Sequence, residues 1–578
     1  MRQDESMVHL RVGPLIRATS PTSVVIWAEC SQACIVTLCA VPQDASPDGT
    51  GNVEETKRIS TPTTNVGGRF FAAPQLHGLT PSTWYTYHLV LSNQDEEAPD
   101  ASDPTLPVQC FRTFASSAGT HAQQRAELRL AYGSCRKLIH PPSDAFNALG
   151  RWLIDHFEMR EQIWPHALLL IGDQIYADEP APEQQIRHPQ LRDGAKTFAD
   201  FALMYEEAWT CDTGVRQALA VLPTYMIFDD HEISNDWNTT PTWRANMLRK
   251  GMEHVLVDGL LAYWVYQGWG NLERRDTVDN PLLCIMHEAA LSGEDALSAL
   301  RACIKADLYQ VRPLPWHYQI RTQPPVFVFN ARTERTTVLA DKPEQIYGPT
   351  RIVSQEQMND LRDWLRLQET NVALLVSSIP ALLPPLIGLA EYLMGRRLWH
   401  QSGTPLHQLG VQLARMQQRV IDRNSFDHWP IYAASWDELV EMVTTQPKDI
   451  LILSGDVHFS YALEAHGISS SARAGRLYQL VSTPLQNMLG AASQRKIELQ
   501  GHITHATYGG LHTRILPLLP ANKKVRVHSN LLFENTLALL TLQPQNERDY
   551  AVKQEYLGVV DGHLETIAHT TFPTGKRE

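Results

Sequence analysis

Hydrophobic and polar positions alternate over short runs in the first 114 residues, which is the pattern of a small β-domain. The runs are separated by Pro, Gly, Asp and Ser, and they include SVVIWAEC, ACIVTLCAV and LTPSTWYTYHLVL. In the last run Tyr85, Tyr87 and Leu89 fall on one face of an extended segment and predict a sandwich core. We therefore predict an N-terminal β-sandwich domain over residues 1–114 and a linker over residues 115–126.

The pattern changes after the linker, where apolar runs alternate with segments of helical period, as in β-α units around a buried sheet. Strands are predicted at residues 128–133, 166–172, 224–229, 326–330, 372–379 and 449–455. We predict one α/β domain over residues 127–578. Two segments rich in helix formers, near 240–310 and 385–445, are interpreted as helical insertions that cover part of a site.

The length, composition and net charge of the chain limit the classes of protein to which it can belong. A chain of 578 residues exceeds the usual size of one domain, so more than one folding unit is expected. Hydrophobic residues make up 43% and charged residues 20%, which fits a folded globular protein. The net charge of -13, without a polybasic run, makes nucleic acid a poor candidate as a general partner.

Cysteine usage and the first residues indicate a reducing compartment. The Cys residues show neither the density nor the spacing of a disulfide framework. The segment MRQDESMVHL lacks the basic and apolar regions of a secretory signal, so we expect a cytoplasmic protein. Residues 371–390 are uncharged and long enough to cross a bilayer, but Pro380, Pro384 and Pro385 interrupt them, so no membrane span is expected.

Residues that can bind metal ions follow four of the predicted strands. In chain order they are Cys135; Asp173, Tyr176 and Asp178; Asp229, Asp230, His231 and Glu232; and Asp456 and His458. Because the carboxyl ends of strands form the site in open α/β sheets, these distant residues are predicted to converge. Carboxylates gathered in this way repel one another unless they are protonated or bound to cations, and near neutral pH cations are favoured.

The spacings suit metal coordination. Asp456 and His458 are two residues apart, so in an extended segment both side chains point to one side. Asp173 could bridge two ions about 3.5 to 4 Å apart. Tyr176 as a phenolate would suit a hard trivalent ion, and Cys135 offers a thiolate. Structural alternatives remain open: an Asp that caps a turn, a Tyr packed for its area and an ordinary buried thiol.

Other hydrolytic schemes lack their signatures. The chain has no Gly-x-Ser-x-Gly elbow and no Gly-x4-Gly-Lys-Ser/Thr loop. The residues RKLIHP that follow Cys135 do not form the Arg cradle that a cysteine-nucleophile phosphatase needs. Serine hydrolysis, P-loop hydrolysis and cysteine-based phosphatase chemistry therefore lose support.

Four motifs resemble the signatures of the PhoD family of alkaline phosphatases and phosphodiesterases, within the calcineurin-like metallophosphoesterases, and they occur in that family's order. The motifs are GSC at 133–135, GDQIYAD at 172–178, DDHEISND at 229–236 and GDVHFS at 455–460. The resemblance implies an α/β fold: an αββα metallophosphoesterase sandwich preceded by an immunoglobulin- or fibronectin-like β-sandwich.

The resemblance also implies a ferric ion and calcium, with Zn²⁺ or Mn²⁺ as alternatives. The implied iron ligands are Cys135, Asp173, Tyr176, Asp456 and His458. Asp173 would bridge to the calcium side, where Asp230 and Asn235 would bind. His231 would protonate the leaving group or support the transition state, and Asp230 would share the catalytic site.

Two arginines are candidates for substrate binding. Arg136 and its neighbour Lys137 lie beside the thiol, although a charged surface loop is the alternative. Arg332 lies in FNARTER, where Asn330 replaces the family's usual Asp. Gln479 likewise replaces an acidic residue of the family. These two replacements lie outside the proposed ligand set, so they affect the prediction of the substrate more than the prediction of metal binding.

The predicted function is metal-dependent phosphoester hydrolysis by a metal-activated hydroxide, on a small phosphomonoester or phosphodiester substrate. The motifs do not separate the two ester classes. The alternative is a catalytically lapsed, metal-stabilised binding or scaffold protein whose helical insertions form an interface. No obligate protein partner is evident in the sequence.

Overall fold

A computed structural model provides the structure of the chain. It describes residues 8–43, 56–93, 96–97, 106, 108–116, 126–139, 144–237, 243–273, 280–309, 313–337, 349–396, 416, 419–420, 426–468 and 474–574. Most of the predicted linker at 115–126 lies outside these residues.

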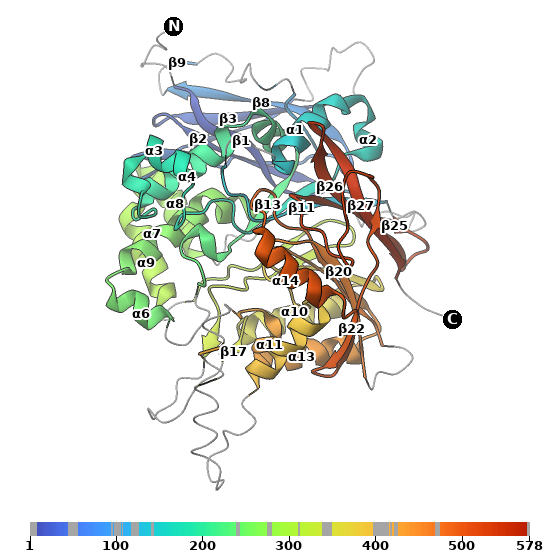
Figure 1. Ribbon diagram of the computed structural model, residues 1–578. Coiled ribbons are helices and arrows are strands. Elements are labelled where there is room, and N and C mark those ends of the chain that lie inside the picture. The colour runs from blue at the N-terminus through green and yellow to red at the C-terminus, as the bar shows by residue number, and fades with distance from the viewer. Residues whose placement is uncertain are drawn as a thin grey trace.

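Residues 10–112 form two five-stranded sheets (Figure 1). The first contains β1 (Leu10–Thr19), β2 (Ser23–Cys30), β5 (Thr64–Val66), β6 (Arg69–Ala72) and β7 (Gln75–His77). The second contains β3 (Ile35–Pro42), β4 (Lys57–Pro62), β8 (Trp84–Asn93), β9 (Glu96–Glu97) and β10 (Cys110–Arg112). Tyr85, Tyr87 and Leu89 on β8 share one buried cluster with Ile26 of β2 and Val36 of β3. The two sheets therefore pack on a common core through the face that the sequence predicted.

Two larger sheets follow. The seven-stranded sheet contains β11 (Leu128–Gly133), β12 (Ala167–Ile171), β13 (Thr224–Ile227), β24 (Leu519–Pro520), β25 (Leu537–Pro544), β26 (Tyr550–Val560) and β27 (His563–Pro573). The eight-stranded sheet contains β14 (Tyr318–Ile320), β15 (Val326–Val328), β18 (Val372–Val376), β19 (Asp449–Ser454), β20 (Tyr461–Gly467), β21 (Leu477–Val481), β22 (His505–Tyr508) and β23 (Leu511–Ile515). The short strands β16 (Thr336–Thr337) and β17 (Pro349–Arg351) pair separately. All six strands predicted after the linker are present.

The two large sheets pack face to face. Leu130 and Leu169 of the seven-stranded sheet share a buried cluster with Val328, Leu374 and Leu451 of the eight-stranded sheet. Burying such side chains contributes roughly 1.5 to 3 kcal/mol each, so this layer is a main source of stability. The architecture is a mixed α/β fold.

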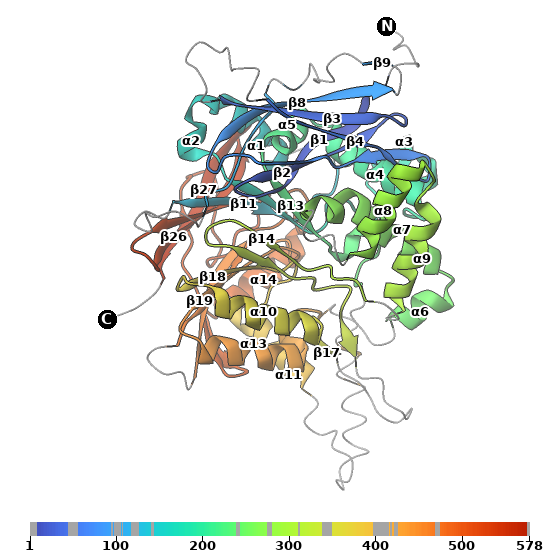
Figure 2. The same cartoon turned by 180° about the vertical axis from the view of Figure 1, so that it is seen from behind.

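Helices lie around the sheets (Figures 1 and 2). α1 (Ala145–Asp155) contacts β26 and β27, whereas α4 (Phe198–Thr210) and α5 (Thr213–Val221) contact β1, and α8 (Pro281–Ser292) contacts β5. The other helices of this half of the chain are α2 (Arg160–Ile163), α3 (Pro182–Arg187), α6 (Trp243–Arg249), α7 (Glu253–Tyr263) and α9 (Leu297–Leu308). Around the eight-stranded sheet lie α10 (Gln355–Leu367), α11 (Pro385–Gly395), α13 (Ala433–Thr445) and α14 (Ala491–Gly501). The segments predicted as insertions thus contain α6 to α9 and α11 with α13.

Parallel pairing fixes where the site lies. β11, β12 and β13 run parallel, and so do β18, β19 and β21, so the carboxyl ends of each set share one edge. Residues 371–390, uncharged in sequence, form β18 and the start of α11. Among the helices that the structure describes, none combines the length and the apolar character needed to cross a membrane.

Candidate metal centre

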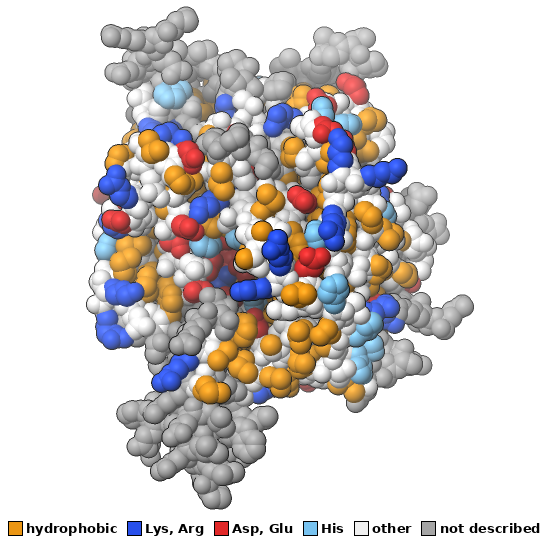
Figure 3. All heavy atoms as spheres, in the orientation of Figure 1, with side chains coloured by type: hydrophobic (Ala, Val, Ile, Leu, Met, Phe, Trp, Pro, Cys, Tyr) orange, Lys and Arg blue, Asp and Glu red, His pale blue; other side chains and the backbone are white. Residues whose placement is uncertain are grey.

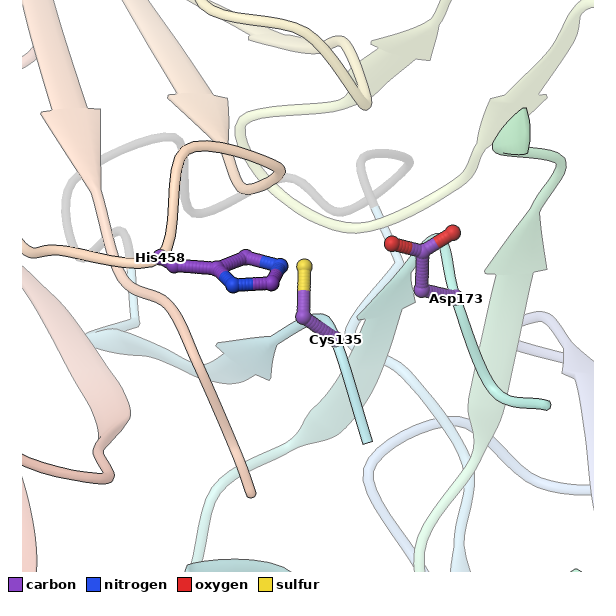
Figure 4. A group of neighbouring side chains, drawn as sticks. All are labelled: Cys135, Asp173 and His458. Carbon is purple, nitrogen blue, oxygen red and sulfur yellow. The ribbon is translucent and has the colours of Figure 1, made fainter. Parts of the chain in front are cut away.

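The loops after β11, β12, β13 and β19 bring the predicted metal ligands together. Ligand atoms of Cys135, Asp173 and His458 lie within 4.8 Å of one another, and so do those of Asp173, Asp229, Asp230 and Asp456. Figure 4 shows the His458 ring and the Asp173 carboxylate on either side of the Cys135 sulfur, each from a different loop. Asp173 belongs to both groups, the position expected of a bridging ligand.

Four of the predicted ligands have left-handed backbone conformations. The φ angles are 58° at Cys135, 54° at Asp173, 69° at Asp456 and 61° at His458. A positive φ is uncommon outside Gly, and such residues gather at ligand-binding and active sites, where the surrounding fold holds them. The repeated strain at these positions is a second observation, independent of residue type, that points to a site.

Glycines next to the ligands allow the loops to approach closely. A Cβ on Gly172 would lie 2.4 Å from the Cβ of Asp229, and a Cβ on Gly455 would lie 2.0 Å from Ser134 Oγ. Any larger side chain would force the loops apart. The Gly of GDQIYAD and the Gly of GDVHFS are therefore required by the packing of the site.

Tyr176 completes the group around Cys135. Its Oη lies 3.2 Å from His458 Nε2 and 3.4 Å from Asp173 Oδ2. Burial raises the pKa of Tyr176 and that of Cys135 well above their usual ranges. Burial also lowers the pKa of His458 to about 4, which keeps its imidazole neutral and its lone pair free for a metal.

The carboxylates are held against one another at considerable electrostatic cost. Burial, and next the negative charge of Asp229, raise the pKa of Asp173 well above its usual range. Burial also raises the pKa of Asp229, against the influence of Arg332, and Oδ2 of Asp229 has no hydrogen-bond partner among the described atoms. Buried carboxylates of this kind are stable as anions only beside cations.

The clustered donors could hold metal ions. A thiolate, an imidazole and a phenol around Cys135 are ligands for a transition metal. The oxygen donors of Asp173, Asp229, Asp230 and Asp456 suit a hard cation such as calcium. The two sets overlap at Asp173, so the described residues offer two adjoining groups of donors.

His231 lies beside this group on η5 (Asp230–Glu232). Its Nδ1 lies 2.9 Å from Asp178 Oδ1, and its ring stacks on Tyr176 with a centroid separation of 4.3 Å. Burial lowers the pKa of His231, but the hydrogen bond to Asp178 and the nearby carboxylates outweigh it and raise the pKa to about 10. An imidazolium at this place carries a proton that it can donate.

The two predicted substrate arginines behave differently. The Arg136 guanidinium is buried in ion pairs with Asp144 at 2.5 Å and Asp212 at 2.7 Å, so it points away from the ligand cluster. Buried carboxylates therefore already pair with the Arg136 charge, and its role in substrate binding stays a prediction. Arg332 does enter the cluster, where its Nη2 lies 3.0 Å from Asp456 Oδ1 and its Nε donates to Asp229.

Asn235 stands at the edge of the site. Its backbone N–H donates to Asp178 Oδ2 at 2.5 Å, while the residue itself is exposed. The other predicted metal ligands lie together around Asp173.

The sequence analysis did not predict a second group of possible metal ligands, which includes Asp456. Ligand atoms of Asp427, His428 and Asp456 lie within 4.8 Å of one another, and His428 Nδ1 lies 2.7 Å from Oε1 of the buried Glu391. The segment DHWPIY carried a signal in the adjacent Asp427 and His428. Glu391 lies mid-helix in α11 and had no local signal.

Glu232, one of the acidic residues that follow the predicted strands, connects two loops of the site by hydrogen bonds. Its carboxylate accepts backbone N–H bonds from Asp173 at 3.1 Å, Gln174 at 2.7 Å and Asp229 at 2.7 Å. It therefore ties the loop after β12 to the loop after β13. Gln479, which replaces an acidic residue, is also structural: it accepts from the N–H of Ala381 and is fully buried.

The fold and the two donor sets define a mixed α/β protein able to hold metal ions. The sequence model of the family described as PhoD-like phosphatase matches residues 130–276, and that of a domain of unknown function (DUF7800) matches residues 7–110. No curated protein matches the chain.

A solved structure of PhoD aligns over 97% of this chain and 90% of its own, with 14% identity and a TM-score of 0.60. The third fibronectin III domain of human KIAA0343 covers 21% of this chain and 93% of its own, with 16% identity and a TM-score of 0.15. GAP50, the anchor in the inner membrane complex of Plasmodium, covers 78% and 90%, with 9% identity and a TM-score of 0.31.

The chain resembles the PhoD-like phosphatases, whose family model matches residues 130–276. The likeness to the PhoD structure concerns the fold. The family match includes three of the four signature motifs, those that carry Cys135, Asp173 and Asp230.

Proposed function

We propose that the chain is a metal-dependent phosphoester hydrolase whose catalytic domain is an αββα metallophosphoesterase sandwich. The domain would span residues 127–578, after an immunoglobulin- or fibronectin-like domain at 1–114 and a linker at 115–126. The face-to-face packing of the two large sheets supports this division. The helices at 240–310 and 385–445 would be insertions in it.

We assign two ions to the donor sets. The iron-side ligands are Cys135, Asp173, Tyr176, Asp456 and His458, and the calcium-side ligands are Asp173, Asp230 and, from the edge of the site, Asn235. The neutral imidazole of His458 and the phenol and thiol at the same group support a ferric ion. The remaining carboxylates support calcium, and Zn²⁺ or Mn²⁺ would be accepted by the same donors.

When bound, the cations would supply positive charge to the phosphoryl oxygens and lower the pKa of water. The residues of the chain do the rest. Asp230 fixes the backbone at the site by accepting from the His231 N–H at 2.9 Å. His231, held by Asp178, donates the proton that the departing alkoxide needs. Arg332 balances the charge of Asp229 and Asp456, and through them it positions the ligands.

One observation carries this proposal: donors from four distant loops meet within 4.8 Å around Asp173, several of them in left-handed backbone conformations. No observation on the described residues favours the alternative of a lapsed scaffold. The eight Cys residues are all free thiols, which supports a cytoplasmic location.

The test is elemental analysis of the purified protein together with hydrolysis of 4-nitrophenyl phosphate and bis(4-nitrophenyl) phosphate. We expect iron and calcium in near-stoichiometric amounts and turnover that disappears on chelation and returns with the ions. A chelated protein that keeps full turnover would overturn the proposal, as would a fully loaded protein that hydrolyses neither ester.

A further inference from the structure

The loop after β11 sends two consecutive cationic side chains in different directions. Arg136 turns inward to Asp144 and Asp212. Lys137, whose backbone N–H donates to Gln486 O at 2.9 Å, extends over Tyr176, with its Nζ 5.5 Å from the ring centroid. Because Tyr176 reaches His458 with its hydroxyl, the Lys137 ammonium is one aromatic ring away from the metal ligands.

The Lys137 ammonium forms an ion pair with a solvent-exposed carboxylate, and this pair can be broken at small cost. Its Nζ lies 3.1 Å from Glu179 Oε2, and the Glu179 side chain is 69% exposed. An ion pair with a solvated carboxylate adds little stability, since water replaces either partner at small cost. The other cations nearby are held more firmly: Arg136 and Arg332 are bound by buried carboxylates.

One face of the molecule carries acidic and basic side chains close together. Figure 3 shows acidic side chains gathered in a hollow near the centre of one face, with Lys or Arg side chains on its margin. The ions that we propose would neutralise the carboxylates of the site. A nearby cation that can exchange an exposed carboxylate for a phosphoryl oxygen adds a direct contact to the anion.

We propose that Lys137 is the specificity-determining cation of the site: on substrate binding it leaves Glu179, binds a non-bridging oxygen of the phosphoryl group and favours phosphate monoesters over diesters. This inference rests on the proposed hydrolase function. The selectivity follows from charge, because a monoester carries roughly two negative charges near neutral pH, as a phosphorylated side chain does, and a diester carries one. Glu179 competes with the substrate for the same ammonium.

The experiment compares metal-loaded wild type with Lys137→Met, Lys137→Arg and Glu179→Gln. Lys305→Met is the matched control, because Lys305 Nζ forms a similar exposed pair at 3.0 Å with Glu253 on distant helices. The measurements are kcat and KM for 4-nitrophenyl phosphate and bis(4-nitrophenyl) phosphate, and the Kd of inorganic phosphate by equilibrium dialysis.

Lys137→Met is expected to raise the monoester KM and the phosphate Kd about 10-fold, the usual loss for one charge-assisted hydrogen bond. The diester KM should rise less, and kcat should change little. Lys137→Arg should stay near wild type, Glu179→Gln should lower the monoester KM, and Lys305→Met should change nothing.

An unchanged phosphate Kd in Lys137→Met would overturn the inference, and equal rises in KM for both esters would overturn the monoester preference. Hydrolysis of neither ester by loaded wild type would count against the proposed function instead. In that case the phosphate Kd series still decides whether Lys137 binds the anion.

Discussion

Tyr176 Oη lies 3.2 Å from Nε2 of His458, although 282 residues separate them in the sequence. The phenol comes from the loop after β12 and the imidazole from the loop after β19, so each belongs to a different large sheet. The contact shows that loops from both large sheets meet at the site. It also places a phenol and an imidazole where one ion can bind both.

Replacing the phenol tests this pair directly. Tyr176→Phe keeps the ring that stacks on His231 and removes only the hydroxyl. If Tyr176 binds a ferric ion as phenolate, the wild-type protein has a visible charge-transfer band, and the variant lacks it. An optical spectrum with iron analysis checks this, and a band of full strength in Tyr176→Phe would remove Tyr176 from the ligand set.

Asp173→Asn should change stability in opposite directions with and without metal. In the chelated protein the variant is expected to have a higher Tm than wild type, because it removes one of several buried like charges. In the loaded protein it should have a lower Tm and lose activity by about 10³-fold or more, since the bridging carboxylate is gone. Calorimetry in both states checks the crossover, and a lower Tm in both states would mean that the carboxylates do not repel.

His231→Gln should lower kcat by about 10² to 10⁴-fold, the range for loss of a general acid. The loss should be largest for an alkyl phosphate and smaller for 4-nitrophenyl phosphate, whose leaving group needs no proton. Steady-state kinetics on the two esters provide the measurement. An equal loss on both would indicate that His231 positions neighbours and does not donate the proton.

Arg136→Met should lower the free energy of unfolding without changing the affinity for substrate. Breaking a buried charge pair costs about 3 to 5 kcal/mol, because Asp144 and Asp212 would remain buried without their cation. Urea denaturation measures the loss, and KM measured well below the midpoint should match wild type. A raised KM with normal stability would restore Arg136 as a substrate residue.

His166 should make the protein sensitive to acid. Burial lowers its pKa from 6.5 to about 3 in the folded state. The unfolded chain therefore takes up a proton below pH 6.5 that the folded chain refuses. The stability that the neutral ring contributes is complete above pH 6.5 and is lost, by about 1.4 kcal/mol per pH unit, as the pH falls towards 3.

The variant His166→Asn keeps an acceptor for the Arg129 N–H, which now donates to His166 Nδ1 at 3.0 Å. The loss of unfolding free energy between pH 7 and pH 5 should be smaller in this variant than in wild type. Urea titrations at the two pH values measure it, with the exposed His563→Asn as control. Identical pH slopes in wild type and His166→Asn would refute the assignment.

The local hydrophobic pattern was sufficient to predict the strands that lead into the loops of the site. The apolar runs around β11, β12 and β19 are buried along their full length, so their hydrophobicity and their polar ends could be seen in the sequence. Cys135, Asp173, Asp456 and His458 followed from that position alone. Their convergence is a consequence of parallel pairing, which the sequence pattern already implied.

Side-chain direction could not be derived in the same way. Arg136 and Lys137 are neighbours with the same charge, yet one is buried between carboxylates from α5's N-cap and α1's N-cap and the other lies over Tyr176. Glu391 had no signal because it contacts His428 across 37 residues of chain.

The sequence by itself determined the strands that precede the candidate donors, the residues proposed as donors and the family that the motifs resemble, because hydrophobic period and motif spacing are local properties. Only the tertiary structure decided which charged side chains, such as Arg136, are buried in ion pairs and which, such as Lys137, pair with an exposed carboxylate. Burial and the direction of each side chain depend on contacts between segments that are hundreds of residues apart, and no local pattern encodes them.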